Sequence, residues 1–109
     1  MSDNLPYGSQ AALDVLAERA RQLKIGWSPD HDDGHHPGDL ADAGISYGIH
    51  AVKNLHRLAH SGRVHTAGDK PRRWPWGCEN WKPKDPRRDL VRAAALIIAE
   101  IERMDRDQP

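Results

Sequence analysis

Apolar residues recur with a helical period near the start of the chain. They fall at i, i+3, i+7 and i+10, which places them in one stripe along a helix. The stripe consists of Leu13, Leu16, Ala20 and Leu23. Ser9 suits the N-cap of this helix, and Gly26 suits the position after its last turn. The pattern predicts a first helix with this stripe against the core.

A second helix is predicted from about residue 39 to residue 60, ending at Ser61-Gly62. Its expected buried stripe is Leu40, Gly44, Tyr47, Ala51, Leu55 and Leu58. Gly44 and Gly48 lie four residues apart, and small residues at this spacing let another helix approach closely. This helix therefore makes a homo-oligomer plausible.

The last helix has the clearest signals. Asp85 suits its N-cap and Pro86 its first position. Two adjacent apolar stripes follow: Leu90, Ala94, Ile97, Ile101 and Met104 form the first, and Val91, Ala95 and Ile98 form the second. A helix that is apolar over so wide an arc is expected at the centre of the core.

The remaining chain predicts no further regular structure. Residues 1–8 read as a tail, and residues 62–84 read as a long loop rich in Trp, Pro and Arg. No segment alternates as a strand would. The sequence predicts an all-α fold: a small single domain, 1–109, of three main helices with a long loop before the last one.

Composition narrows the class of protein. The 109 residues carry a formal net charge of zero, so binding to nucleic acid or to an anionic membrane is not expected. The longest apolar block, residues 93–99, is too short to span a membrane. The single cysteine, Cys78, favours a reducing compartment, which predicts a location in the cytoplasm.

Charge is unevenly distributed along the chain. Residues 28–42 hold five aspartates and no Lys or Arg, whereas residues 70–92 are rich in Lys and Arg. If the two blocks meet, they pair in part, and burying them requires specific hydrogen bonds. The alternative is that each block is solvated on its own face of the protein.

The acidic block includes the stretch HDDGHHPGDL, residues 31–40. Carboxylates suit Mg²⁺ and imidazoles suit zinc or iron, so a metal site is one interpretation. Another is that Asp32 and Asp33 cap turns while His35 and His36 are exposed. A third is ligand binding without a metal.

Three other residues invite functional interpretations. His56 and His60 stand four apart on the second helix, a spacing that can hold zinc. Arg57 occupies the position where a metalloprotease helix has glutamate, so that motif is absent and a solvent-facing pair is expected. Cys78 has no cysteine partner and no evident catalytic base, and is expected to be structural.

The block KPRRWPWGCENWKPKDPRRD, residues 70–89, combines indoles with guanidinium groups. Stacking on indole and arginine contacts to phosphate together can hold a nucleotide, and the N-terminus of the last helix adds backbone donors. The alternative is structural: Trp74, Trp76 and Trp81 clamp a proline-rich loop onto the helices.

The pattern of residues 16–47 and 74–106 resembles a family of small phage and prophage proteins. The matching runs are ERARQLKIGWSPDHDDGHHPGDLADA, then WPW, WKP and DLVRAAALIIAEIERMDR. The resemblance implies a phage origin but no stated activity, and residues 48–73 lie outside it.

Two distant resemblances imply mechanisms. HHPGDLADA is similar to a motif of MazG-type nucleoside triphosphate pyrophosphohydrolases, with His35 and His36 where that family has paired glutamates and with Asp89 in the place of a later aspartate. That resemblance implies an Mg²⁺-dependent enzyme. GWSPDHDDGHHPGDL looks like a run in ryanodine-receptor repeat domains, and it implies nucleotide-type ligand binding without turnover.

Our leading hypothesis is a phage-encoded, non-enzymatic protein that binds a small anionic ligand, such as a nucleotide signal of host defence, without a cofactor. The predicted ligand-binding residues are Trp27, Asp32, Asp33, His36, Arg72, Arg73, Trp74, Trp76, Arg87 and Arg88. The alternatives are an Mg²⁺-dependent pyrophosphohydrolase and an inhibitor of a host protein. In the enzyme, the metal ligands would be Asp32, Asp33, Asp39 and Asp89.

Overall fold

The computed structural model describes residues 8–25, 36–61 and 71–107. These residues form α1 (Gln10–Lys24), α3 (Asp39–Ser61), a 3₁₀ turn (Cys78–Asn80) and α4 (Pro86–Arg106). The described residues contain no strand, so the prediction of an all-α domain with three main helices is confirmed. No helix in this part of the chain is long and apolar enough to cross a membrane.

Local capping fixes the starts of α1 and α4, as the sequence predicts. The Ser9 hydroxyl accepts a hydrogen bond from the Ala12 N–H at 3.2 Å, and the Asp85 carboxylate accepts one from the Arg88 N–H at 2.9 Å. Pro86 occupies the first turn of α4, where its missing N–H costs nothing.

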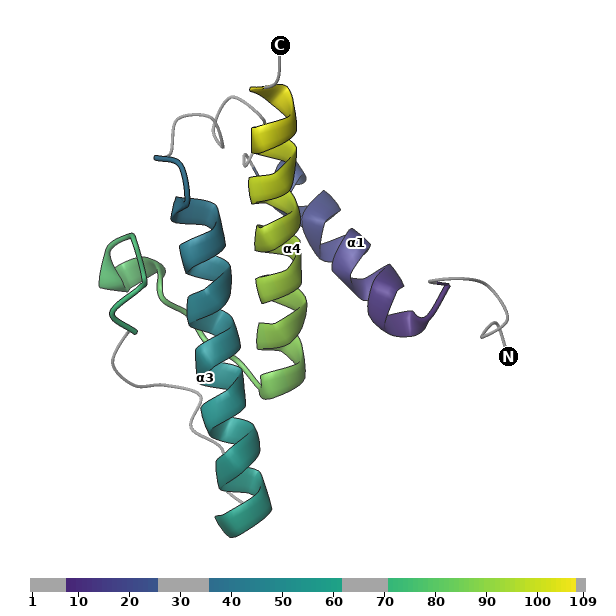
Figure 1. The fold of residues 1–109 in the computed structure, drawn as a ribbon. Coiled ribbons are helices and arrows are strands. Elements are labelled where there is room, and N and C mark those ends of the chain that lie inside the picture. Colours follow the sequence, from purple (N-terminus) through teal and green to yellow (C-terminus); the bar gives the residue numbers. More distant parts are fainter. Residues whose placement is uncertain (1–7, 26–35, 62–70, 108–109) are drawn as a thin grey trace.

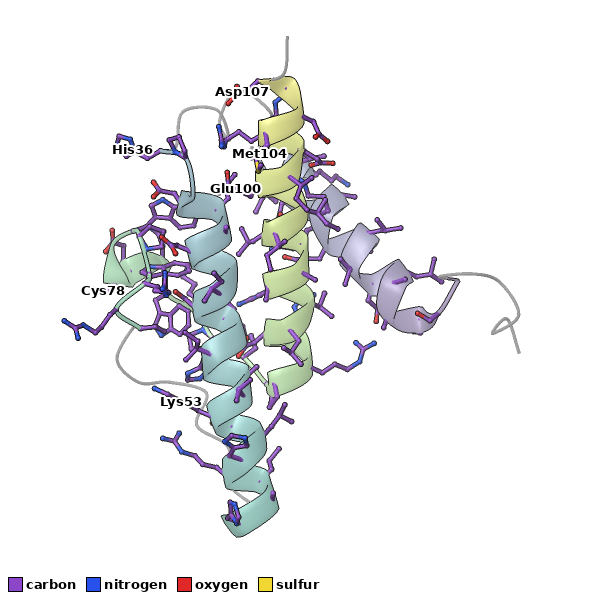
Figure 2. All side chains as sticks on the ribbon, viewed as in Figure 1. His36, Lys53, Cys78, Glu100, Met104 and Asp107 are labelled. Carbon is purple, nitrogen blue, oxygen red and sulfur yellow. The ribbon has the colours of Figure 1, made fainter. Side chains whose placement is uncertain are left out.

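The start of α3 is held by a residue from another helix. Gly38 has φ +93°, a conformation that glycine adopts without strain, and it turns the chain into α3. Glu100 lies on α4 opposite this start (Figure 2), and its carboxylate accepts the Ala41 N–H at 3.1 Å. Burial raises the pKa of Glu100, but hydrogen bonds from Arg103 and Ala41 outweigh burial and hold this pKa below its usual value. The first turn of α3 is thereby fixed to α4.

The three helices form a flat layer with α4 in the middle. Helix α3 runs antiparallel to α4 on one side, and α1 crosses α4 on the other side (Figure 1). The molecule measures 50 × 41 × 22 Å, so it is thin in one direction. We call this arrangement the helical layer. It has two broad faces.

The loop formed by residues 71–85 covers part of one face and completes the core. Buried side chains from α3, α4 and this loop pack together: Leu40, Ala43, Tyr47, Trp74, Trp81, Ala93, Leu96 and Ala99. The Tyr47 ring stacks on Trp81 with centroids 4.8 Å apart and meets Trp74 edge-on at 5.4 Å. Trp74 and Trp81 therefore hold the loop on the helices, the structural role weighed for them in the sequence.

The prediction for the buried side of α1 is wrong. Leu13, Leu16 and Leu23 are 40–58% exposed, whereas Glu18, Arg19 and Gln22 are buried. The reason lies in ion pairs with α4: Arg19 pairs with Glu102 at 2.8 Å and Glu18 pairs with Arg88 at 2.8 Å. Because these partners are more than sixty residues away in sequence, helical periodicity could not reveal them.

On the two longer helices, the buried residues were predicted correctly only in part. On α3, Leu40, Gly44, Tyr47 and Ala51 are buried as expected. Leu55 and Leu58 are exposed, because α3 extends beyond the start of α4 (Figure 1). On α4, the stripe of Val91 and Ala95 is buried, whereas the stripe predicted first is exposed at Leu90, Ile97, Ile101 and Met104.

Candidate functional site

A cleft of about 520 Å³ opens where α1, α3, α4 and the 71–85 loop meet. Clefts of this size hold small ligands. Its lining residues are Glu18, Arg21, Gln22, Ile25, Tyr47, Trp74, Trp76, Asn80, Lys82, Arg92 and Leu96. We call this site the tryptophan cleft.

Among the described residues that line the tryptophan cleft, Glu18 is the one carboxylate. Its side chain is 1% exposed and receives two hydrogen bonds from Arg21, at 2.7 and 2.9 Å, and an ion pair from Arg88 at 2.8 Å. Burial raises the pKa of Glu18, but the hydrogen bonds and charge of Arg21, with Arg88 and Arg92 nearby, lower this pKa below its usual value overall. Glu18 is therefore ionised and fixes two guanidinium groups.

Arg92 is held between the loop and α3. Its guanidinium lies 5.4 Å from the centroid of the Tyr47 ring and donates a hydrogen bond to the Lys82 carbonyl. Burial raises the pKa of the Tyr47 hydroxyl, and the charge of Arg92 opposes that rise. The Nε atom of Arg92 is buried without a hydrogen-bond partner among the described residues. Arg92, which lines the cleft, therefore has an Nε–H that is available to donate a hydrogen bond.

The two indoles in the cleft differ in exposure. Trp74 is 5% exposed, and its Nε1–H donates to the Gly77 carbonyl at 3.1 Å. Trp76 is half-buried and lies edge-on to Trp74, with centroids 5.3 Å apart. Trp74 is therefore part of the core beneath the cleft, and Trp76 is the indole with a surface accessible to a ligand.

A second, shallower cleft of about 440 Å³ lies between α1 and the start of α4. Arg87 and Arg88, both predicted to bind phosphate, line it. Arg87 pairs with Asp14 at 2.9 Å, and Arg88 pairs with Glu18. Hydrogen bonds from Gln10 and Arg87 lower the pKa of Asp14. These two arginines therefore join α1 to α4.

The other predicted ligand-binding residues are dispersed. Trp27, Asp32 and Asp33 lie outside the described residues. His36 is exposed just before α3 (Figure 2), where its N–H donates to the Asp39 carboxylate at 3.3 Å. Arg72 is exposed on the loop.

The acidic and basic blocks meet at one ion pair among the described residues that belong to them. Arg73 contacts Asp42 at 3.1 Å, and both side chains are exposed, at 61% and 37%. This pair fastens the 71–85 loop to α3 at the protein surface. Whether residues 31–35 share a cleft with the loop lies outside the described residues.

In the hypothesis of an Mg²⁺-dependent pyrophosphohydrolase, Asp39 and Asp89 would bind the same metal ion. Asp39 begins α3, whereas Asp89 lies in the first turn of the antiparallel α4. Asp89 interacts electrostatically with His50, eleven residues along α3 from Asp39, which corresponds to roughly 16 Å of helix. The two carboxylates therefore cannot hold the same ion. Among the described residues, no group of three or more His, Cys, Asp or Glu side chains could hold a metal.

Asp89 has a structural position instead. Its carboxylate is fully buried and accepts the Lys84 N–H at 2.7 Å, which ties the end of the loop to α4. Burial raises the pKa of Asp89, although the Lys84 N–H, His50 and Arg92 oppose that rise. A carboxylate enclosed in this way fixes the loop that forms one wall of the tryptophan cleft.

Among the described residues, neither the histidines nor the cysteine lines the tryptophan cleft. His56 and His60 are exposed on α3, as expected, and His50 is buried edge-on against Trp81 at 5.6 Å. Cys78 is a free cysteine, exposed at the outer end of the loop (Figure 2).

The cationic residues of the cleft were missed in the sequence. Arg21, Lys82 and Arg92 come from α1, the loop and α4. The one local signal was the i, i+3 spacing of Glu18 and Arg21 on the side of α1 opposite the leucine stripe. The sequence does not show that this polar side is buried against α4.

In comparisons with protein-family models, curated proteins and solved structures, no match to this chain was found. The chemistry of the tryptophan cleft therefore supports the functional proposal on its own.

Proposed function

We propose that the tryptophan cleft binds a small anionic ligand with a planar aromatic group, a nucleotide being the best-fitting class. The described residues that line this cleft of about 520 Å³ include three cationic side chains, one carboxylate and an accessible indole, and this combination supports the proposal. The protein acts as a binding module without a catalytic step.

Charge supports an anionic ligand. Arg21, Lys82 and Arg92 line the cleft, and Glu18, the one carboxylate among the described lining residues, is shared between Arg21 and Arg88. The lining therefore has excess positive charge, although the whole chain is neutral. A cleft with low-dielectric walls strengthens attraction to an anion, and guanidinium groups donate paired hydrogen bonds to phosphate.

Aromatic surface supports a planar group. The Trp76 ring is half-buried and is held edge-on by Trp74, so its orientation is fixed before a ligand arrives. Stacking of a base on an indole contributes about 1–3 kcal/mol and tolerates different bases. The finer prediction, a nucleotide signal of host defence, rests on the sequence resemblance alone.

Isothermal titration calorimetry with ATP, adenosine and inorganic triphosphate tests the proposal. We expect ATP to bind more tightly than either part. Lys82→Gln removes a charged donor worth roughly 1.5–3 kcal/mol, so ATP affinity falls at least about tenfold. Trp76→Ala weakens ATP binding but leaves triphosphate binding unchanged, because triphosphate has no base to stack.

Lys53→Gln is the matched control for Lys82→Gln. Lys53 is exposed on α3 outside the cleft lining (Figure 2), so its loss leaves ATP binding unchanged. Absence of any heat with ATP at 100 µM protein, or equal weakening by both lysine variants, overturns the proposal. Release of pyrophosphate on adding Mg²⁺ contradicts binding without turnover.

A further inference from the structure

The face of the helical layer opposite the tryptophan cleft is apolar and exposed. On α4, the exposed stripe of Leu90, Ile97, Ile101 and Met104 follows spacings of seven, four and three residues. On α3, Ile45, Val52 and Leu55 are exposed at spacings of seven and three residues. The exposed leucines of α1 have the same period. We call these ten side chains the apolar face.

The contacts of α4 show that the apolar face and the cleft lie on opposite sides of the layer. Arg92 lines the cleft, and Ile101 comes nine residues later. At 100° per residue, nine residues leave the two side chains half a turn apart. On α3, Tyr47 lines the cleft, and Val52 follows five residues later, 140° around the helix. Helices α3 and α1 occupy the two edges of α4 between these sides (Figure 1).

The exposed area is as large as the apolar part of a stable interface. The ten side chains are 39–58% exposed. A fully exposed aliphatic side chain presents on the order of 100 Å² of apolar surface, so the ten present on the order of 500 Å². A standard interface buries about 800 Å² per partner, of which about 65% is apolar in homodimers. The apolar face meets that requirement.

Gly48 gives a second, independent observation. It lies between Ile45 and Val52 in the α3 seam, and a Cβ built there meets no atom of the described residues within 4 Å. By contrast, a Cβ on Gly44 would lie 2.9 Å from the Ala93 carbonyl oxygen. Close packing against α4 explains why residue 44 is a glycine, but it does not explain the glycine at residue 48. A glycine inside a helix costs about 1 kcal/mol in helix propensity. Close approach of a helix from outside the chain would explain why residue 48 is nevertheless a glycine.

We propose that the apolar face pairs with the same face of a second copy of this chain. Seams spaced by three and four residues pack best against seams of the same period, which a second copy supplies on all three helices. A two-fold axis between two copies places the same face of each copy in contact. The net charge of the chain is zero, so net charge does not make two copies repel each other. The pair then has two layers of helices, the common way in which domains bury apolar faces.

No other part of the sequence offers a matching seam. The segments outside the described residues number at most ten residues each, less than three turns of helix, and none carries apolar residues at alternating spacings of three and four. Pairing through the apolar face leaves both tryptophan clefts open on the outer surfaces of the dimer. The proposal therefore stands independently of ligand binding.

Light scattering coupled to size-exclusion chromatography tests the pairing. The unmodified chain is expected to elute with twice its mass of 12.2 kDa. Val52→Glu places a charge in the apolar face and is expected to weaken pairing at least tenfold, giving the monomer mass at micromolar concentration. Lys53→Glu, the same new side chain one position later on the exposed outer side of α3, keeps the dimer mass.

A monomer mass for the unmodified chain at 100 µM overturns the proposal, as does a dimer that persists in both Val52→Glu and Ile101→Glu. Should the glutamate variants fail to fold, thermal unfolding of the unmodified chain decides. The Tm of a dimer rises with protein concentration because association is linked to folding, whereas the Tm of a monomer does not change.

Discussion

The two faces of the helical layer use the same three helices in opposite ways. On the cleft face, charged residues such as Glu18 are buried and the aromatic residues form a packed cluster. On the other face, aliphatic residues with regular helical spacing remain 39–58% exposed. A regular apolar pattern is therefore a poor guide to burial in this chain, because the most regular apolar stripes are not the ones that build its core.

The largest effect is expected from comparing the two faces within α4. Leu96 is 2% exposed and Ile101 is 51% exposed. Leu96→Ala leaves a cavity among α3, α4 and the loop and should lower the free energy of unfolding by about 2–5 kcal/mol. Ile101→Ala, measured in dilute protein where copies do not pair, should cost under 1 kcal/mol. Urea denaturation measures both, and equal losses would show that the two sides of α4 do not differ in this way.

The buried charges of the cleft face should make stability depend on pH. The pKa of Glu18 is held below its usual value of 4.5, so its stabilising contribution is present above pH 4.5 and is lost as the pH falls through the lower, folded-state value. Glu18→Gln should cost roughly 1.5–3 kcal/mol at pH 7, because charged hydrogen bonds to Arg21 and Arg88 are weakened.

As the pH falls below 4.5 toward the lower, folded-state pKa of Glu18, this difference should shrink. Urea midpoints of the unmodified chain and Glu18→Gln, compared at pH 7 and pH 3, check the prediction. A gap of the same size at both pH values would mean that ionised Glu18 does not stabilise α1 against α4. Lys24→Gln, at the exposed end of α1, is a control expected to show little change at either pH.

The two glycines of α3 give a smaller and more specific contrast. Gly44→Ala should destabilise the chain by about 1–3 kcal/mol, since the new Cβ would lie 2.9 Å from backbone oxygen of α4. Gly48→Ala should raise the stability of dilute, unpaired chains by about 0.5–1 kcal/mol, because it gains helix propensity in open space. Thermal unfolding at low concentration measures both; loss of stability in Gly48→Ala would place an intrachain neighbour there.

The smallest effect is expected at the surface pair of Arg73 and Asp42. Both side chains are more than a third exposed, so solvent screens their interaction. Arg73→Ala should change the free energy of unfolding by at most about 1 kcal/mol. A larger loss in urea denaturation would show that this pair, and not the buried aromatic cluster, holds the loop in place.

The sequence correctly predicted the features that depend on residues close together in the chain. Ser9, Asp85 and Pro86 marked helix starts correctly because capping is a local interaction. The buried side of α1 could not be predicted, since Arg19 is buried by pairing with Glu102, eighty-three residues away. The stripes were correct as helical patterns but were assigned to the core of one chain, and periodicity alone does not distinguish an internal contact from an external one.

The tryptophan cleft includes two of the predicted ligand-binding residues, but its cationic residues are not the predicted ones. Trp74 and Trp76 line the tryptophan cleft, although Trp74 is mainly a core residue. Arg87 and Arg88 pair with α1, and the cleft takes its charge from Arg21, Lys82 and Arg92 instead. Choosing among many arginines requires knowing which carboxylates lie nearby, and that depends on how α1 crosses α4.

In this protein, one face of the helical layer is proposed to bind a ligand, and the other face is proposed to pair two chains. Sedimentation velocity of the unmodified protein with a fluorescent ATP analogue tests both parts in one run. The fluorescence is expected to sediment with a species of twice 12.2 kDa. Protein sedimenting at the monomer mass, with all fluorescence remaining at the rate of free nucleotide, would contradict it.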